Sequence, residues 1–289
     1  MSDTTDNRRG ALLLVAAAAV FTADVSVLRL LSEGVSNGQV VFFRSLMQLV
    51  IVAGFILWRN PALAGTTQPW LLVARGITSL ICWWLYYASF AVLDLALAST
   101  LTFTTSLFVV ILAPFVLGER IGPVRAASTV IGFAGVVLAS GANPFDIAPG
   151  VWLGLGSAVA AAVLIFQNRV LARTQATATI MLWIALVATL GTAPGAVMNW
   201  TALTGGDVAV LLIAGTLGTL GMLLTIEAYR YGEVSALAPF PYTRILFALL
   251  AGVLLFGESA TPAELAGSAI IIACGLIAGR RMRRAPTAL

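Results

Sequence analysis

Long apolar stretches of this sequence contain ionisable side chains, among them Asp24, Arg44, Arg75, Glu227 and Arg244. A charged group is costly in an apolar environment, so such residues normally face a partner or a water-filled cavity, and they mark solute pathways. At a rise of about 1.5 Å per residue, Asp24 and Arg44 fall at the same depth in adjacent stretches, roughly 10 Å below one surface. We therefore predict a buried Asp24–Arg44 ion pair, which is either structural or in direct contact with a solute.

Glu227 and Arg75 fall near the opposite surface, in stretches that occupy equivalent places in the two halves of the chain. A contact between them would form a gate or a structural ion pair, and the sequence favours neither role. Arg244 is the alternative partner for Glu227. Because Asp24 and Glu227 are the only deeply placed acids, proton coupling would require one of them, whereas facilitated diffusion needs neither.

A polar and aromatic stripe in the stretch 70–91 is suited to line a solute cavity. Ser79, Cys82, Tyr86 and Ser89 recur there at helical spacing, and the stretch also carries Trp83. An aromatic ring can stack on a solute while hydroxyl groups hold its polar head. The alternative is that these aromatic residues serve only packing or anchoring at the membrane surface.

Two further stretches, 96–117 and 235–256, carry the remaining cavity candidates. Pro239 and Pro241 remove two helix donors, so backbone carbonyls become available for a hinge or for binding an ammonium group. The alternative is a kink that only shapes the helix. The candidates in these stretches are Thr102, Phe103 and Ser106, which share one helical face, and Pro239 and Tyr242.

The composition excludes several classes of protein. Of the 289 residues, 60% are hydrophobic and 10% are charged, whereas soluble proteins have roughly 45–50% and 25%. Lipid must therefore be the main solvent. The sequence has no histidine, no metal-ligand spacing, no Walker motif and no Gly-x-Ser-x-Gly elbow, so we expect neither an enzyme nor a bound cofactor or metal. The arginines fall between apolar stretches and form no polar face, which argues against a nucleic-acid partner.

The apolar stretches predict an all-α membrane protein with ten transmembrane helices, since a span needs about 20 apolar residues. With the N-terminus in the cytoplasm, most arginines fall at the inner side, as topology signals do. We therefore expect a multi-pass protein of the bacterial inner (plasma) membrane with both termini cytoplasmic. The predicted spans are 10–31, 37–58, 70–91, 96–117, 124–141, 150–172, 178–198, 207–230, 235–256 and 263–280.

The chain also repeats itself at one common offset. Gly118-Glu119 recurs as Gly257-Glu258, and Pro123 recurs as Pro262. This predicts two five-helix repeats, residues 8–142 and 147–284. An odd number of helices inverts the second repeat, and inverted repeats are typical of transporters that work by alternating access. The alternative is a duplication without mechanistic meaning.

The stretch from Glu227 to Tyr242, continued by Phe256-Gly257-Glu258, resembles the last part of an EamA domain, and Leu117-Gly118-Glu119-Arg120 is its counterpart in the first half. Two such domains in tandem resemble the drug/metabolite transporter superfamily. The resemblance implies export of amino acids or other metabolites, with the YddG-type amino-acid exporters as one group. The sequence departs from internal symmetry where the two prolines of the ninth span face threonines in the fourth, so the halves need not move alike.

These observations predict a secondary transporter that exports small metabolites, with amino acids favoured, through a cavity near the membrane midplane. A multidrug, organic-phosphate or nucleotide-sugar carrier is the first alternative, but a phosphate carrier needs several basic groups in its cavity. A channel would show rings of like charge or a carbonyl filter, and an intramembrane enzyme would show clustered ionisable groups. We expect a small-molecule substrate and membrane lipid as partners, and a monomer rather than a dimer.

Overall fold

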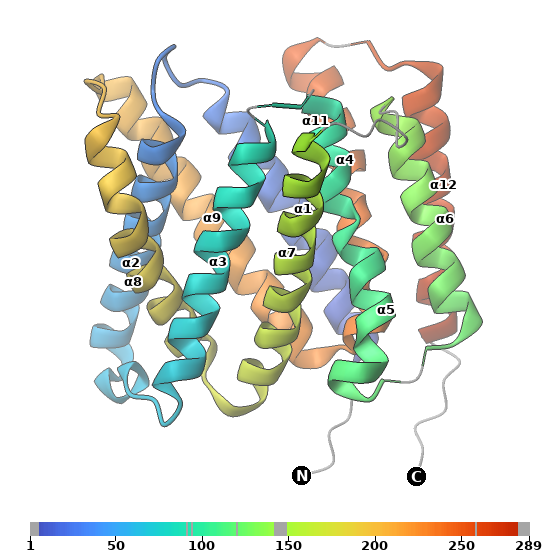
Figure 1. Ribbon diagram of the computed structural model, residues 1–289, viewed down its shortest axis with the longest axis horizontal. Coiled ribbons are helices and arrows are strands. Elements are labelled where there is room, and N and C mark those ends of the chain that lie inside the picture. Colours follow the sequence, from blue (N-terminus) through green and yellow to red (C-terminus); the bar gives the residue numbers. More distant parts are fainter. Residues whose placement is uncertain are drawn as a thin grey trace.

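The computed structural model describes residues 6–90, 92–93, 95–119, 121–141, 149–257 and 259–282. Within these residues the chain is helical and contains no strand, and its long helices run side by side (Figure 1). Glu258 and Arg120, which belong to the motifs that recur in the two halves, lie outside the described residues. The uninterrupted long helices are α1 (Asn7–Leu28), α2 (Asn37–Arg59), α3 (Pro69–Phe90), α6 (Pro123–Ser140), α7 (Pro149–Thr174), α8 (Thr177–Met198), α9 (Gly205–Tyr231) and α12 (Pro262–Met282).

Two further spans are interrupted. The fourth consists of α4 (Leu95–Phe103) and α5 (Thr105–Leu117), and the ninth consists of α10 (Val234–Leu237), the 3-10 turn η2 (Phe240–Tyr242) and α11 (Thr243–Phe256). A 3-10 turn η1 (Pro61–Ala64) follows α2. These elements match the ten predicted spans, and α1 begins on the side of the molecule where α12 ends (Figure 1).

Helix ends are set by local sequence. Ser36 and Thr204 accept hydrogen bonds from the first turns of α2 and α9, and each forms a capping box. Gly118 and Gly257 end α5 and α11 in the left-handed conformation, with φ of 67° and 65°, which favours glycine. The repeated Gly-Glu motif therefore begins at the same backbone turn in both halves of the chain.

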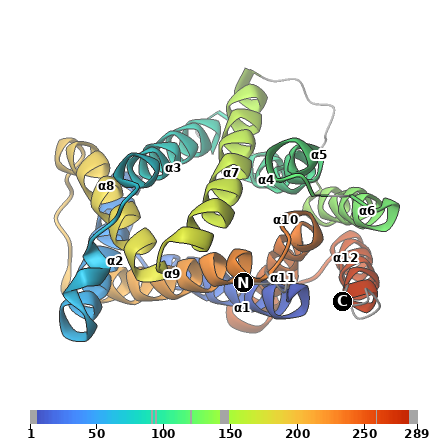
Figure 2. The ribbon, with the colours of Figure 1, turned by 90° about the horizontal axis from the view of Figure 1, so that it is seen from below.

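The helices pack mainly as pairs: α1 with α9, α2 with α8, α3 with α7, and α6 with α12. Seen along the helix axes, the pair of α6 and α12 lies at one end of the molecule and the pair of α2 and α8 at the other (Figure 2). Small residues allow close approach: a Cβ atom added to Gly135 of α6 would lie 2.9 Å from the backbone oxygen of Gly267 in α12. The outermost pair is thus fixed by backbone contact.

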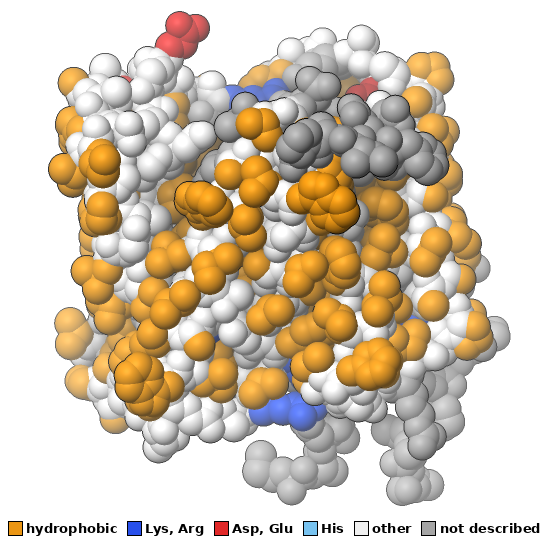
Figure 3. All heavy atoms as spheres, in the orientation of Figure 1, with side chains coloured by type: hydrophobic (Ala, Val, Ile, Leu, Met, Phe, Trp, Pro, Cys, Tyr) orange, Lys and Arg blue, Asp and Glu red, His pale blue; other side chains and the backbone are white. Residues whose placement is uncertain are grey.

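The outer surface is apolar around the middle of the molecule. Orange hydrophobic side chains cover the face shown in Figure 3, and charged side chains appear only towards its two ends. Trp58, Trp70 and Phe115 are each more than four-fifths exposed. By length and composition, eight described segments are apolar enough to cross a membrane, and a ninth in α12 is shorter. Lipid-facing side chains account for this exposure.

Candidate functional site: two neighbouring cavities

The larger cavity, here called the central cavity, has a volume of about 430 Å³ and lies between α1, α3, α4 and α11. Arg29 and Phe256 lie in its wall, so it extends towards the end of the molecule where α1 and α11 end. Tyr86, Thr102 and Phe103, which the sequence identifies as cavity candidates, all line it. Its remaining charged wall residue is Arg244 of α11, whose side chain is exposed.

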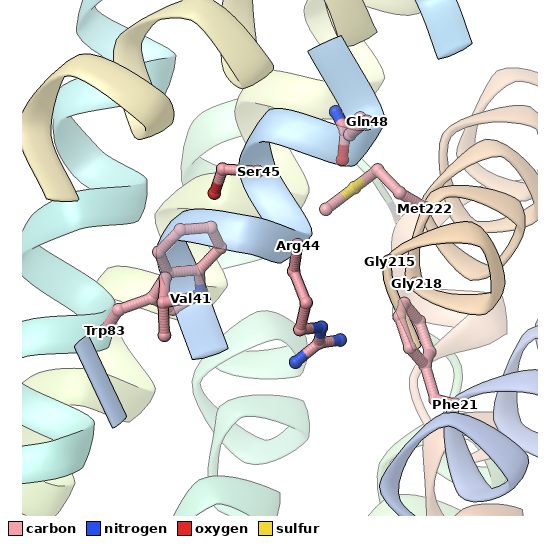
Figure 4. A pocket seen from close by; sticks show the side chains of 9 residues that line it. All are labelled: Phe21, Val41, Arg44, Ser45, Gln48, Trp83, Gly215, Gly218 and Met222. Carbon is pink, nitrogen blue, oxygen red and sulfur yellow. The ribbon is translucent and has the colours of Figure 1, made fainter. Parts of the chain in front are cut away.

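A second cavity of about 200 Å³, here called the α2–α9 pocket, lies beside it. Figure 4 shows Trp83 of α3 and Phe21 of α1 on opposite sides, with Arg44 of α2 between them. The other lining residues come from one face of α2 and one face of α9. They are Val41, Ser45 and Gln48 on α2, and Gly215, Gly218 and Met222 on α9.

An ion pair lies at the border of the two cavities. Asp24 and Arg44 form the salt bridge that the sequence predicts. The Asp24 side chain is only 1% exposed, whereas 27% of the Arg44 side chain is exposed. Within the part of the chain that the structure describes, Oδ1 of Asp24 has no hydrogen-bond partner. The acid is therefore sequestered, and its cation remains accessible from the α2–α9 pocket.

Arg244 does not pair with Glu227, so that prediction is wrong. Its guanidinium carbon lies 5.9 Å from the centre of the Phe21 ring, close enough to Asp24 for an electrostatic interaction. Glu227 instead accepts from Thr177 and forms an ion pair with Arg230, one turn along α9, at 3.3 Å. The cause is the packing order, because the C-terminal end of α9 meets the start of α8 rather than α11.

The predicted contact between Glu227 and Arg75 is not formed either, so that prediction is also wrong. Arg75 is buried, donates from Nε to Oδ1 of Asn168 at 2.9 Å, and also donates to Ser79. Because α3 packs on α7, Arg75 finds its partners there and on its own helix. Ser79 thus holds an arginine in place and does not line either of the two cavities.

Ser106, Pro239 and Tyr242 lie behind the cavity wall. Tyr242 is fully buried, donates to the backbone oxygen of Thr129 at 3.3 Å, and packs edge-on against Phe103 with ring centres 6.1 Å apart. Ser106 and Pro239 are buried as well. Tyr242 therefore supports Phe103 from behind. Trp83 and Arg44 line the α2–α9 pocket, whereas Tyr86, Thr102 and Arg244 line the central cavity.

Sequence reasoning missed the α2–α9 pocket as a whole. A usable signal was present, because Val41, Arg44, Ser45 and Gln48 recur at the spacing of one helical face. Ser45 and Gln48 are uncharged polar residues in an otherwise apolar helix, a pattern that indicates a polar face directed towards a cavity or a partner helix. The partner helix offers glycines: a Cβ atom on Gly218 would lie 3.0 Å from Nη2 of Arg44.

The end of the molecule where α1 begins is closed by hydrogen bonds between the two halves. The Glu119 carboxylate accepts from the backbone N–H groups of Val234 and Ser235, at 2.9 and 2.8 Å. Arg125 forms an ion pair with Glu233 and donates to Ser235 at 3.1 Å. Glu119 and Arg125 therefore tie the start of the interrupted ninth span to the first half of the chain.

Two arginines fasten α7 and α9 to each other at the same end. Arg169 of α7 is buried and donates to the backbone oxygens of Tyr229 and Arg230 at 2.9 and 2.7 Å. Arg230 in turn donates to the backbone oxygens of Ala172 and Gln175. Each helix thus has its terminal carbonyls satisfied by an arginine of the other, which compensates for the acceptors left free at a helix C-terminus.

Comparison with known proteins identifies this architecture. The model of the EamA-like transporter family matches residues 8–141 and 148–278. The chain belongs to the EamA-like transporter family. It is therefore a membrane transporter of the drug/metabolite transporter superfamily, embedded in the membrane by many spans. Within the described residues, no group of three or more acidic or cysteine side chains could hold a metal ion.

Relatives of this EamA-like transporter carry different solutes. This chain is 26% identical over 236 residues to an S-adenosylmethionine uptake transporter of Rickettsia bellii, and the matched region covers 81% of this chain and 80% of that protein. It is 28% identical over 279 residues to a pseudopaline exporter of Pseudomonas aeruginosa, covering 92% and 95%. A riboflavin transporter of Rhizobium johnstonii is 26% identical over 221 residues, covering 76% and 73%.

The fold is also that of a solved structure. A crystal structure of a protein superposes with a TM-score of 0.80 over 96% of this chain and 98% of that chain, at 20% identity. At this identity the likeness concerns the fold alone.

Proposed function

We propose that this transporter exports small metabolites with an amino-acid head, and that Arg244 binds the carboxylate of that head in the central cavity. The observation that supports this most strongly is the environment of Arg244. Asp24 balances the charge of Arg44, whereas no described carboxylate forms an ion pair with Arg244, which is exposed in the cavity. A cation deep in a membrane protein is costly without a counter-charge, and a guanidinium group matches a carboxylate with two parallel hydrogen bonds.

The balance of charges favours a carboxylate over a phosphate ester. Arg244 interacts with Asp24 only at a distance and forms no ion pair within the described residues, so it suits one negative charge. Arg29 packs over Phe256 at 4.5 Å and lies nearer the mouth. Two arginines at different depths would draw an anion inward. Tyr86 and Thr102 offer hydroxyl groups to an ammonium group, and Phe103 offers an apolar face.

The name of one relative fits this chemistry, since S-adenosylmethionine is an amino-acid derivative with a carboxylate and an ammonium group on one carbon. The riboflavin transporter does not bear on it. The outward direction in this proposal follows the exporter among the relatives. In the same proposal the protein is a monomer in the bacterial inner membrane, with both termini in the cytoplasm. The central cavity of this conformer then opens to the outside, and the protein works by alternating access.

Counterflow in liposomes tests the proposal. Purified protein is reconstituted into liposomes loaded with unlabelled alanine, and entry of labelled alanine is followed with and without a pH gradient. We expect counterflow with the wild type, and a loss of at least tenfold with Arg244→Gln while Arg59→Gln, which changes an exposed arginine at the end of α2, retains activity. Absence of counterflow with alanine and with other amino acids, from folded protein, would refute the proposal, and so would full activity of Arg244→Gln. Gradient-dependent entry would assign a proton to Asp24 or Glu227.

A further inference from the structure

The two cavities adjoin each other along the same two helices. On α1, Phe21 lines the α2–α9 pocket and Thr22, the next residue, lines the central cavity. On α3, Trp83 lines the pocket and Tyr86, one turn further along, lines the central cavity. The guanidinium carbon of Arg244 lies 5.9 Å from the centre of the Phe21 ring, and Phe21 borders the pocket. A solute whose carboxylate lies at Arg244 would therefore reach the pocket by passing Phe21.

The α2–α9 pocket contains a hydroxyl group that the protein leaves unsatisfied. Threonines within these helices donate to the carbonyl four residues earlier, as Thr22 does to Ala18 and Thr219 does to Gly215. Ser45 is 5% exposed and lines the pocket, and no hydrogen bond of its hydroxyl to the described chain is seen. Its oxygen is not one of the fully buried atoms without a partner, so the hydroxyl is accessible from the pocket and is available to water or a solute.

Gln48 adds a directed acceptor to the same wall. Its amide nitrogen donates to the backbone oxygen of Met181 at 3.0 Å, so its position is fixed and its carbonyl oxygen remains available to accept. Arg44 supplies donors from the neighbouring turn of α2, with part of its side chain exposed. The wall formed by Arg44, Ser45 and Gln48 can therefore both donate to and accept from a bound group.

Aromatic side chains and a thioether line the rest of the pocket. Trp83 and Phe21 lie on opposite sides, with Arg44 between them and Met222 on the α9 side (Figure 4). Aromatic faces and a thioether interact favourably with a planar ring, which would lie beside the Arg44 side chain. A dry cavity of about 150 Å³ accommodates benzene, so the observed volume of about 200 Å³ accommodates one ring-sized end group.

We propose that the α2–α9 pocket is a second subsite, which binds a flat nitrogen heterocycle at the far end of an extended amino-acid substrate. This inference rests on the proposed function, because Arg244 holds the amino-acid head. The heterocycle stacks on Trp83 and Phe21, accepts from Arg44 or Ser45, and donates to Gln48. The substrate class is then amino acids extended by a heterocycle, and free small amino acids fill only the central cavity.

Competition for alanine counterflow tests the second subsite. The unlabelled competitors are alanine, phenylalanine and S-adenosylhomocysteine, which has an amino-acid head and an adenine ring. For the wild type we expect S-adenosylhomocysteine to inhibit at a concentration about tenfold lower than alanine, the factor that corresponds to 1.4 kcal/mol. Phenylalanine, which has a ring without heteroatoms, should fall between them.

Ser45→Leu fills the pocket and removes its hydroxyl, and Trp83→Leu removes one stacking face. Each variant should lose most of the tenfold preference while labelled alanine still exchanges, so alanine exchange is an internal control for folding. Gly206→Ala, at the start of α9 where an added Cβ has space, is the matched control and should keep the preference.

The outcomes separate the two proposals. No amino-acid exchange by the wild type refutes the proposed function. Alanine exchange that depends on Arg244, with S-adenosylhomocysteine no better than alanine, refutes the second subsite alone. A preference that Ser45→Leu and Trp83→Leu both leave intact also overturns it. If Ser45→Leu fails to fold, Trp83→Leu together with stabilisation of the wild type by S-adenosylhomocysteine in thermal unfolding decides the question.

Discussion

Removing Arg44 should destabilise this transporter more than removing Asp24, although each change breaks the same ion pair. The difference follows from exposure: 1% of the Asp24 side chain and 27% of the Arg44 side chain are accessible. Arg44→Gln leaves a buried carboxylate without its cation, which costs about 3–5 kcal/mol. Arg244 supplies part of the missing counter-charge, so we expect a loss of free energy of unfolding near the lower limit, about 3 kcal/mol.

Asp24→Asn leaves the guanidinium group of Arg44 facing the α2–α9 pocket, where water can hydrate it. Asparagine also retains one acceptor oxygen. The loss should therefore be that of a charge-assisted hydrogen bond, about 1.5 kcal/mol. In the double variant the two losses should not add, because the pair is already broken by the first change.

Equilibrium unfolding in mixed detergent micelles, followed by circular dichroism, measures these losses. Arg59→Gln changes an exposed arginine of the same helix and should alter the free energy of unfolding by less than about 0.5 kcal/mol. Equal losses for the two single variants, or a larger loss for Asp24→Asn, would show that burial does not govern the pair. Additive losses in the double variant would show that the two side chains do not stabilise each other.

Three further perturbations test other parts of the fold. Gly135→Leu places a side chain against the Gly267 backbone of α12 and should lower the free energy of unfolding by about 1–3 kcal/mol, measured by the same unfolding experiment. Gly54→Leu, where an added Cβ has open space, is the control and should not lower it. Glu119→Gln leaves one acceptor oxygen where the carboxylate uses two, so one hydrogen bond to the N–H groups of α10 is lost and the other is no longer charge-assisted. Amide hydrogen exchange there should therefore become faster. Pro239→Ala restores a donor in the interrupted span and should slow opening of that segment, seen as slower hydrogen exchange; faster exchange would contradict the role of proline as the interruption.

Much of the fold could be predicted from composition and spacing. The spans follow because each must be apolar over the thickness of the membrane, and the Asp24–Arg44 pair follows because antiparallel neighbours place residues at equal depth in contact. Both inferences need only sequence distance and adjacent helices. The family likewise follows from motifs that recur in both halves.

The partners of Glu227, Arg75 and Arg244 could not be predicted in this way. Glu227 and Arg75 share a depth, but α9 packs against α1 and α2 while α3 packs against α7, and helix order across the bundle is not encoded in hydropathy. Arg244 follows the interruption formed by η2, so its depth and facing direction differ from those of a continuous helix. The pocket formed by α2 and α9 depends on a contact between helices distant in sequence.

Both cavities lie on the seam between the two repeats, which bears on how a solute could drive transport. The central cavity is lined by α1, α3 and α4 of the first repeat and by α11 of the second. The α2–α9 pocket is lined by α1, α2 and α3 of the first repeat and by α9 of the second. A solute in either cavity therefore contacts both repeats. If the repeats rotate relative to each other, as in the alternating access that we propose, the solute would bind the two states with different free energy, and a ligand shifts a conformational equilibrium only by such a difference. The Asp24–Arg44 pair joins two helices of one repeat, so it would persist through this movement while contacts to Arg244 change.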